Sequence, residues 1–223
     1  EWMLAGRITV NDVVADQPGL TVDPETVRIT VDGKRISPPS QARAVGLVVM
    51  LHKPAGVLTT MEDPHGRPTV AELISYQQRL YPIGRLDLDS TGLLLLTNDG
   101  ELTNRLLHPR YKVEKEYRVR IAESPLTPVE RQRFAGGLML EDGMTAPCHI
   151  RCVDAGVYLV RLREGRKRQI KRMFGALGRT VVALHRERFG PIALGNLPEG
   201  SSRVLCDQEL EQLYRAVTLE SRP

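Results

Sequence analysis

The stretch GRLDLDSTGLLLLTNDG, residues 84–100, is the part of the sequence that says most about the fold. Its four consecutive leucines, residues 93–96, are typical of a strand that is buried on both faces. Asp87 and Asp89 precede that strand, and the glycines on either side of them favour turns. The pattern predicts a polar loop that carries two carboxylates and runs directly into a core strand.

Three kinds of chemistry compete with a plain surface turn at these carboxylates. A calcium loop would require a bidentate Glu at its twelfth position, where Asn98 stands, so calcium is disfavoured. The spacing Asp87-x-Asp89-x-Thr91 also matches the nucleophile motif of haloacid-dehalogenase-type phosphatases. However, residues 81–85 make a poor strand before it, and no motif for further magnesium ligands follows. The third alternative is an aspartate that acts on nucleic acid, and the segment alone favours a surface turn over it.

Composition describes a folded protein and excludes several classes. Of 223 residues, 41% are hydrophobic and 26% are charged, which excludes disorder over most of the chain. The longest apolar stretches, residues 46–51 and 92–96, are too short to span a membrane. The three cysteines form no CxxC pair, which disfavours a disulfide framework or a zinc site. We therefore expect a cytoplasmic protein without a bound metal.

Charge is unevenly distributed along the chain. The formal net charge is +4, yet residues 161–188 contain ten basic and only two acidic residues. A basic patch on an otherwise mildly acidic body indicates a polyanionic partner. Aromatic residues make up only 4% of the chain, which argues against a broad stacking platform for single strands.

Apolar periodicity predicts an α+β protein with a largely antiparallel sheet, because helices do not alternate strictly with strands. Residues 1–37 form a small module with a hairpin turn at Asp32-Gly33, and residues 38–45 have the composition of a linker. In residues 113–121 one face is apolar except for Lys115. Beyond the linker we expect strands over 47–51, 93–97, 113–121, 156–163 and 180–183, and helices over 69–80, 101–108, 166–177 and 206–216.

Four sequence motifs occur in a fixed order along the predicted strands and helices, and their order is typical of a known family. They are Lys53-Pro54-x-Gly56, the segment 84–100, Lys115-Glu116-Tyr117 and the basic segment 164–174. With this order and spacing the chain resembles the bacterial ribosomal-RNA pseudouridine synthases, in the subfamily with an N-terminal ribosomal-protein-type RNA-binding domain. The resemblance implies a catalytic domain of the pseudouridine synthase fold, with a mixed, largely antiparallel sheet, over residues 46–217. Residues 1–37 are similar to the later part of the RNA-binding domain, which would make them a partial α/β domain.

The resemblance also implies roles for individual residues. Asp87 would be the catalytic nucleophile or base, and Tyr117 would stack on the target base. A basic residue of the last motif would pair with Asp87. The match falls on Lys171, with Arg168 as the alternative, while Asp89 would bond local backbone amides. Ile170 would pack against the base, and Arg85 would fill the gap left by the flipped uridine. Lys53 would contact a phosphate or, alternatively, support the sheet edge. The other expected RNA contacts are the basic residues Arg166, Lys167, Arg168 and Arg172.

The implied reaction isomerises a uridine of ribosomal RNA to pseudouridine. No atoms are gained or lost, so no cofactor or metal is expected, in agreement with the absence of a GxGxxG or Walker motif. Residues 63–70 look more like those of the large-subunit enzymes, so we predict a large-subunit target, with small-subunit RNA as the alternative. A non-catalytic RNA-binding or ribosome-assembly factor on the same fold is a further alternative, against which the set Asp87, Tyr117 and Lys171 argues. No heptad or exposed apolar stripe is visible, so we expect a monomer.

Overall fold

A computed structural model describes residues 1–17, 19–23, 26–36 and 46–218. The chain divides into two compact units, Glu1–Gly46 and Leu47–Pro223, and each is described by itself. The linker expected at 38–45 lies outside the described residues. In the described ranges, no helix has the length and hydrophobicity needed to cross a membrane.

The first unit is built on a four-stranded antiparallel sheet in the order β2-β1-β3-β4. Asp32 and Gly33 join β3 to β4 with φ angles of 50° and 75°. Positive φ at both central residues is the signature of a tight hairpin turn, and the hairpin predicted at this dipeptide is confirmed. The strands are β1 (Ile8–Val10), β2 (Val13–Val14), β3 (Ile29–Val31) and β4 (Lys34–Ile36).

The second unit contains a nine-stranded sheet whose main path is β11-β12-β8-β13-β7-β5-β15, with β14 paired to β13 and β6 to β7. Within the part of the chain that the structure describes, only the β13–β7 pair is parallel. The mixed, largely antiparallel sheet predicted from the sequence is therefore confirmed. The strands are β5 (Val48–Lys53), β6 (Tyr81–Pro82), β7 (Thr91–Thr97), β8 (Lys115–Ile121), β11 (His149–Asp154), β12 (Val157–Leu162), β13 (Val181–Phe189), β14 (Ile192–Ala193) and β15 (Ser202–Val204).

The helices of this unit are short. The helix expected over 69–80 is wrong, because only Val70–Leu73 forms one 3-10 turn, η1. Ile74 is extended, and the residues after it pack against the core in that extended path, so tertiary packing overrides the helical spacing. The other helical elements are α1 (Gly100–Leu107), η2 (Pro109–Tyr111), α2 (Pro128–Gly136), α3 (Gln169–Gly175) and α4 (Asp207–Arg215).

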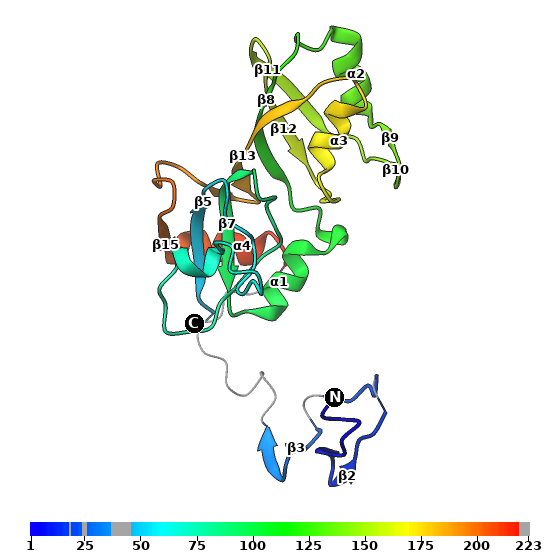
Figure 1. Cartoon of the computed structure of the whole chain (residues 1–223), viewed down its shortest axis with the longest axis vertical. Helices are drawn as coiled ribbons and strands as arrows, with labels where there is room; N and C mark the ends of the chain where they lie inside the picture. Colours follow the sequence, from blue (N-terminus) through cyan, green and yellow to red (C-terminus); the bar gives the residue numbers. More distant parts are fainter. Residues whose placement is uncertain (18, 24–25, 37–45, 219–223) are drawn as a thin grey trace. The chain divides into compact units, whose positions relative to one another are not determined.

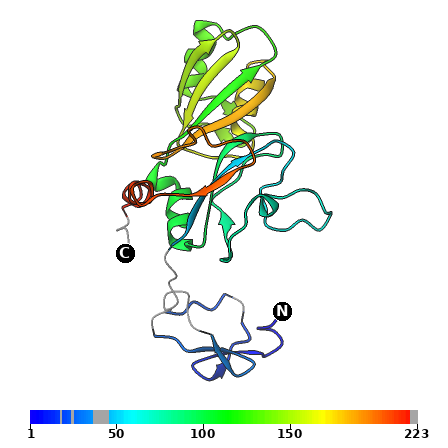
Figure 2. The same ribbon diagram turned by 90° about the vertical axis from the view of Figure 1, so that its left-hand side faces the viewer.

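One half of the sheet is covered on both faces, which explains its continuous apolar strands. Alternate residues of β5 and β7 enter two different core clusters: Met50 and Leu95 pack with α1 and α4, whereas Leu51 and Leu94 pack with the segment around η1. Figure 2 shows α4, in red, on one side of these strands and the segment around η1, in cyan-green, on the other. Burial on both faces leaves no position for an alternating polar residue.

The other half of the sheet packs against α2 and α3, near the top of Figure 1. Phe174 of α3 lies 4.7 Å from Phe134 of α2 and 5.6 Å from Tyr158 of β12, measured between ring centroids. The long strand β13 serves both halves, because Leu184 belongs to this core and Phe189 to the core of the first half. The strand expected over 180–183 therefore extends to Phe189, and it ties the two halves into one sheet.

Candidate active site

A cavity of about 970 Å³ lies where the loop before β7, strand β8 and the loop before α3 meet. These segments are far apart in the sequence, and the sheet brings them together. The expected site residues that line the cavity are Arg85, Asp87, Tyr117, Arg166, Lys167, Arg168 and Ile170. Lys53, Lys171 and Arg172 are not among its lining residues.

The loop that carries Asp87 is held through its main chain. Thr59 Oγ1 donates to the carbonyl of Leu86 (2.8 Å), and the amide of Gly56 donates to the carbonyl of Leu88 (2.8 Å). The amide of Ser90 closes a turn on the carbonyl of Asp87 at 3.1 Å. These bonds fix the backbone on both sides of Asp87 without using its carboxylate, so the half-buried side chain is free to serve the cavity that it lines.

Lys53 is the central support of this loop. Its side chain is fully buried, and Nζ donates to the carbonyls of Pro54 (2.8 Å), Asp87 (3.2 Å) and Ser90 (2.9 Å). Burial lowers the pKa of Lys53 to about 8, against the opposing influence of the Asp89 and Asp87 carboxylates. The expected contact of Lys53 with an RNA phosphate is therefore wrong, because a buried ammonium that is bound to carbonyl oxygens does not reach the RNA.

Tyr117 and Ile170 approach the cavity from two different elements. Tyr117 lies on β8, opposite Val160 of β12 and Arg186 of β13. Ile170 stands in the first turn of α3 and is only 3% exposed, so it packs in the core while it also lines the cavity. The cavity thus offers an aromatic ring and an aliphatic side chain together with a carboxylate, a combination that suits a planar base.

Lys171 forms a different ion pair from the expected one. Its Nζ lies 2.5 Å from Oδ1 of Asp89, not on Asp87. The bond to Lys171 also lowers the pKa of Asp89, while burial acts in the opposite direction. The predicted pairing of Lys171 with Asp87 is corrected, and so is the purely local role predicted for Asp89. The physical reason is the position of the two carboxylates. Asp89 lies two residues beyond Asp87, within hydrogen-bond distance of the Lys171 side chain on α3.

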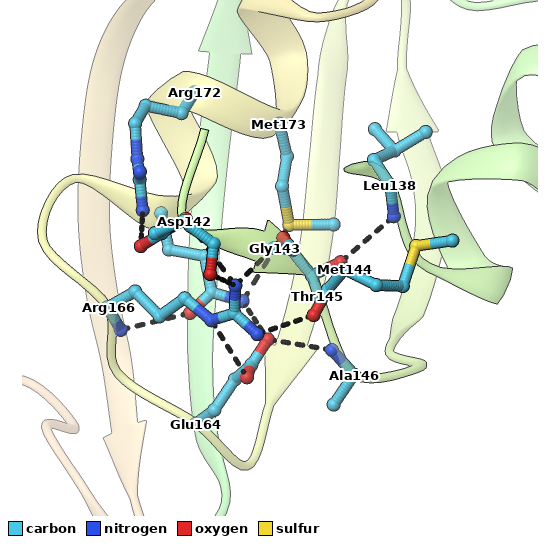
Figure 3. Close-up of polar contacts among 11 residues, drawn as sticks. Leu138, Asp142, Gly143, Met144, Thr145, Ala146, Glu164, Arg166, Arg172 and Met173 are labelled. Carbon is cyan, nitrogen blue, oxygen red and sulfur yellow. Dashed lines mark hydrogen bonds and ion pairs between the residues drawn. The ribbon is translucent and has the colours of Figure 1, made fainter. Parts of the chain in front are cut away.

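Arg166 and Arg172 both bind a hairpin of this unit (Figure 3). The hairpin consists of β9 (Met139–Leu140) and β10 (Gly143–Met144). Arg166 donates to the carbonyl of Gly143 at 2.9 Å, and Arg172 donates to Oδ2 of Asp142 at 2.9 Å. Both guanidinium groups therefore have carboxylate partners inside the protein, and the RNA contacts expected of them stay predictions.

Lys167 and Arg168 remain as exposed cations beside the cavity. Both line it, and within the described residues neither takes part in an ion pair. Arg168 adopts a left-handed backbone with φ of 51°, so α3 begins at Gln169 rather than at the expected residue 166. Lys167 and Arg168 therefore lie before the helix and are exposed, whereas Lys171 and Arg172 lie on the helix and are paired with carboxylates.

The cavity residues to which the sequence analysis gave no role include Lys115, Arg186 and Phe189. Lys115 carries a signal, because it is the single charge on the apolar face of residues 113–121. Arg186 has no such signal in the sequence, because it lies among polar and charged residues that are typical of a solvent-exposed strand. In the structure its side chain is only 2% exposed.

Comparisons with known proteins identify the family of the chain. Residues 47–176 match the family model described as RNA pseudouridylate synthase. The chain is 41% identical to an uncharacterized RNA pseudouridine synthase of Aquifex aeolicus, over 99% of this chain and 89% of that protein. It is 35% identical to ribosomal large subunit pseudouridine synthase B of Bacillus subtilis (96% and 87% covered) and 35% identical to ribosomal small subunit pseudouridine synthase A of Vibrio cholerae (96% and 92% covered).

A crystal structure of a pseudouridylate synthase matches with a TM-score of 0.73 and 31% identity, over 95% of this chain and 90% of that one. Fold, cavity and relatives together define an enzyme of the isomerase class that acts on RNA. The chain belongs to the RNA pseudouridine synthase family.

Proposed function

We propose that this enzyme isomerises a specific uridine of ribosomal RNA, and that Asp87 is its catalytic carboxylate. The observation that carries the proposal is the meeting of Asp87, Tyr117 and Ile170 in one cavity. The relatives named for ribosomal RNA and the exposed cations Lys167 and Arg168 support an RNA substrate.

The chemistry needs one carboxylate and a base held in place. The bond from ribose to the uracil nitrogen breaks, the base turns, and a bond forms from ribose to carbon 5 of the ring. Carbon 5 loses its hydrogen as a proton and the freed nitrogen gains a proton, so atoms and electrons balance. Asp87 acts as nucleophile or base from a backbone that Lys53 and Thr59 hold rigid. Tyr117 and Ile170 keep the uracil ring close to the ribose while the base turns.

The target uridine must leave the RNA stack before it can enter the cavity. Flipping a base costs a few kcal/mol. Arg85 is exposed and lines both this cavity and a neighbouring one of about 520 Å³, so it stands at the rim. A guanidinium at that place can stack in the vacated position and contact phosphates, which lowers the cost of flipping.

We propose a large-subunit target. The support is the loop 63–70, in which Asp63 binds the side chain of Arg67, and the large-subunit relative of Bacillus subtilis. The small-subunit relative of Vibrio cholerae has the same identity, which makes small-subunit RNA the second candidate. We propose further that residues 1–37 belong to an RNA-binding domain, that residues 46–217 form the catalytic domain, and that the enzyme works as a monomer in the cytoplasm.

Tritium release tests this proposal. The substrates are separate large-subunit and small-subunit ribosomal RNA transcripts that carry uridine labelled at carbon 5. We expect the wild-type protein to release tritium from the large-subunit transcript in the presence of EDTA, and Asp87→Asn to release none although it binds RNA normally. Asp154→Asn, at the end of the edge strand β11, is the matched control and should retain activity. Retained turnover in Asp87→Asn would exclude the catalytic assignment, and release from the small-subunit transcript alone would exclude the proposed target.

A further inference from the structure

A second group of charges faces the cavity from strands β8 and β13. In their register Lys115 pairs with Phe189, and Tyr117 pairs with Arg186. Cross-strand partners project from the same face of a sheet, so these four side chains share the face that lines the cavity. Two cations therefore stand beside Tyr117, the residue that we place against the target base.

Both cations contact the same aromatic ring. Lys115 Nζ lies 5.5 Å and Arg186 Cζ 5.3 Å from the ring centroid of Phe189. The electron-rich face of the ring stabilises each charge in part. Lys115 Nζ also lies 3.9 Å from the position that a Cβ would occupy on Gly165, so it reaches the loop before α3 on the far side of the cavity.

Arg186 has an unused donor at this place. Its Nε donates to the carbonyl of Leu93 at 2.7 Å, which anchors the side chain. One terminal nitrogen, NH2, is buried and has no hydrogen-bond partner within the described residues. A buried donor without a partner costs about 1–3 kcal/mol, and a rotation of the guanidinium toward an anion in the cavity would recover part of that cost.

No carboxylate neutralises this pair within the part of the chain that the structure describes. Glu164 lines the same cavity but is bound to Arg166 and to the amide of Ala146. Burial, with the charge of Arg186 as the second cause, lowers the pKa of Lys115 to about 8. Two like charges that share a partly buried site without a counter-ion are unfavourable unless an anion is bound there.

We propose that Lys115 and Arg186 form an anion site that binds a backbone phosphate of the RNA next to the target uridine. The inference rests on the proposed function, because it takes the strand that enters the cavity to be RNA. Uracil is neutral, whereas every nucleotide brings one phosphodiester anion, which can accept from a guanidinium and an ammonium together. The site holds the nucleotide by its phosphate while Tyr117 holds its base.

The test removes one charge from the site and follows the salt dependence of catalysis. Lys115→Met keeps the apolar stem and removes the ammonium. The measurement is kcat/KM for tritium release from the ribosomal RNA transcript on which the wild type is active, over a series of KCl concentrations. We expect the slope of log kcat/KM against log[KCl] to become shallower by about 0.7, the value for one phosphate contact on a single strand. Lys115→Arg should restore most of the slope.

Arg120→Met is the matched control. It removes one positive charge from the same strand, but Arg120 is exposed on the opposite face of the sheet. Its slope should equal that of the wild type. Because Arg186 also anchors β13 to β7, Arg186→Gln is a second variant whose folding is checked by thermal melting before its slope is measured.

The outcomes separate the anion site from the proposed function. Tritium release by the wild type with equal slopes for Lys115→Met and Arg120→Met overturns the anion site and leaves the function standing. A fall in kcat at an unchanged slope also overturns it, since the ammonium would then serve Asp87. If the wild type releases no tritium from either transcript, the proposed function fails. Filter binding of the same transcripts over the KCl series then tests the anion site. A shallower salt slope for Lys115→Met but not for Arg120→Met supports the site, and equal slopes overturn it.

Discussion

The loop that carries Asp87 and the basic segment before and within α3 both line the candidate site, but they are held in opposite ways. The loop is bound through its main chain by Lys53, Thr59 and Gly56, and its carboxylate is left for the cavity. The basic segment is bound through its side chains. Arg166 and Arg172 bind the β9–β10 hairpin (Figure 3). Lys171 binds Asp89.

This contrast teaches that a run of cations is not the same as an RNA-binding face. Of the basic side chains in residues 166–172, only Lys167 and Arg168 are exposed beside the cavity without an ion pair in the described part of the chain. Two cations to which the sequence analysis gave no role, Lys115 and Arg186, also line the cavity without a carboxylate partner in the described part of the chain. Position in the fold, rather than local charge density, decides which cation is available.

The largest effect is expected from breaking the main-chain support. Lys53→Met leaves the carbonyls of Pro54, Asp87 and Ser90 without their donor in a buried place. Each buried acceptor without a partner costs about 1–3 kcal/mol, so the variant should melt several degrees lower and should lose tritium release almost completely. Lys34→Met, on an exposed strand of the first unit, is the control for removal of a lysine. A Lys53→Met protein that melts normally and turns over normally would contradict the support role.

A smaller effect should separate the two kinds of cation in the basic segment. Lys167→Met removes an exposed charge, so the salt slope of RNA binding should become shallower by about 0.7. Arg172→Met removes a charge that Asp142 already neutralises, so its slope should be unchanged while amide exchange in residues 139–144 becomes faster. The measurements are filter binding over a KCl series and hydrogen exchange. Equal loss of slope in both variants would show that Arg172 leaves Asp142 to bind RNA.

The smallest effect is a pH dependence that reports on Lys115. Its pKa is about 8 in the folded protein, below the ordinary value of 10.5, so the unfolded chain binds more protons between these two pH values. The free energy of unfolding of the wild type should therefore rise, relative to that of Lys115→Met, as the pH increases from 8 to 10.5. Urea denaturation of both proteins across this range measures the difference. A difference that stays constant with pH would show that Lys115 is not buried beside Arg186.

The features that depend on a local pattern could be predicted from the amino-acid sequence. Continuous apolar runs predicted β5 and β7, the Asp32-Gly33 dipeptide predicted a hairpin, and the amphipathic residues 206–216 predicted α4. These three features follow from residues within one turn or one strand of each other. The order of the four motifs along the chain predicted the family, which the family model confirms.

The burial and the partners of each charged side chain could not be predicted, because they depend on the folded structure. Lys53 is buried against the loop that carries Asp87, 34 residues away in the sequence. Lys171 is paired with the carboxylate of Asp89, 82 residues away in the sequence. The energy of a charged group depends on its burial and on the partners within a few ångströms, and both are set by strands that are distant in the sequence. For the same reason the helix expected over 69–80 gave way to an extended segment, since packing against β5 and β7 stabilises it more than local helix propensity does.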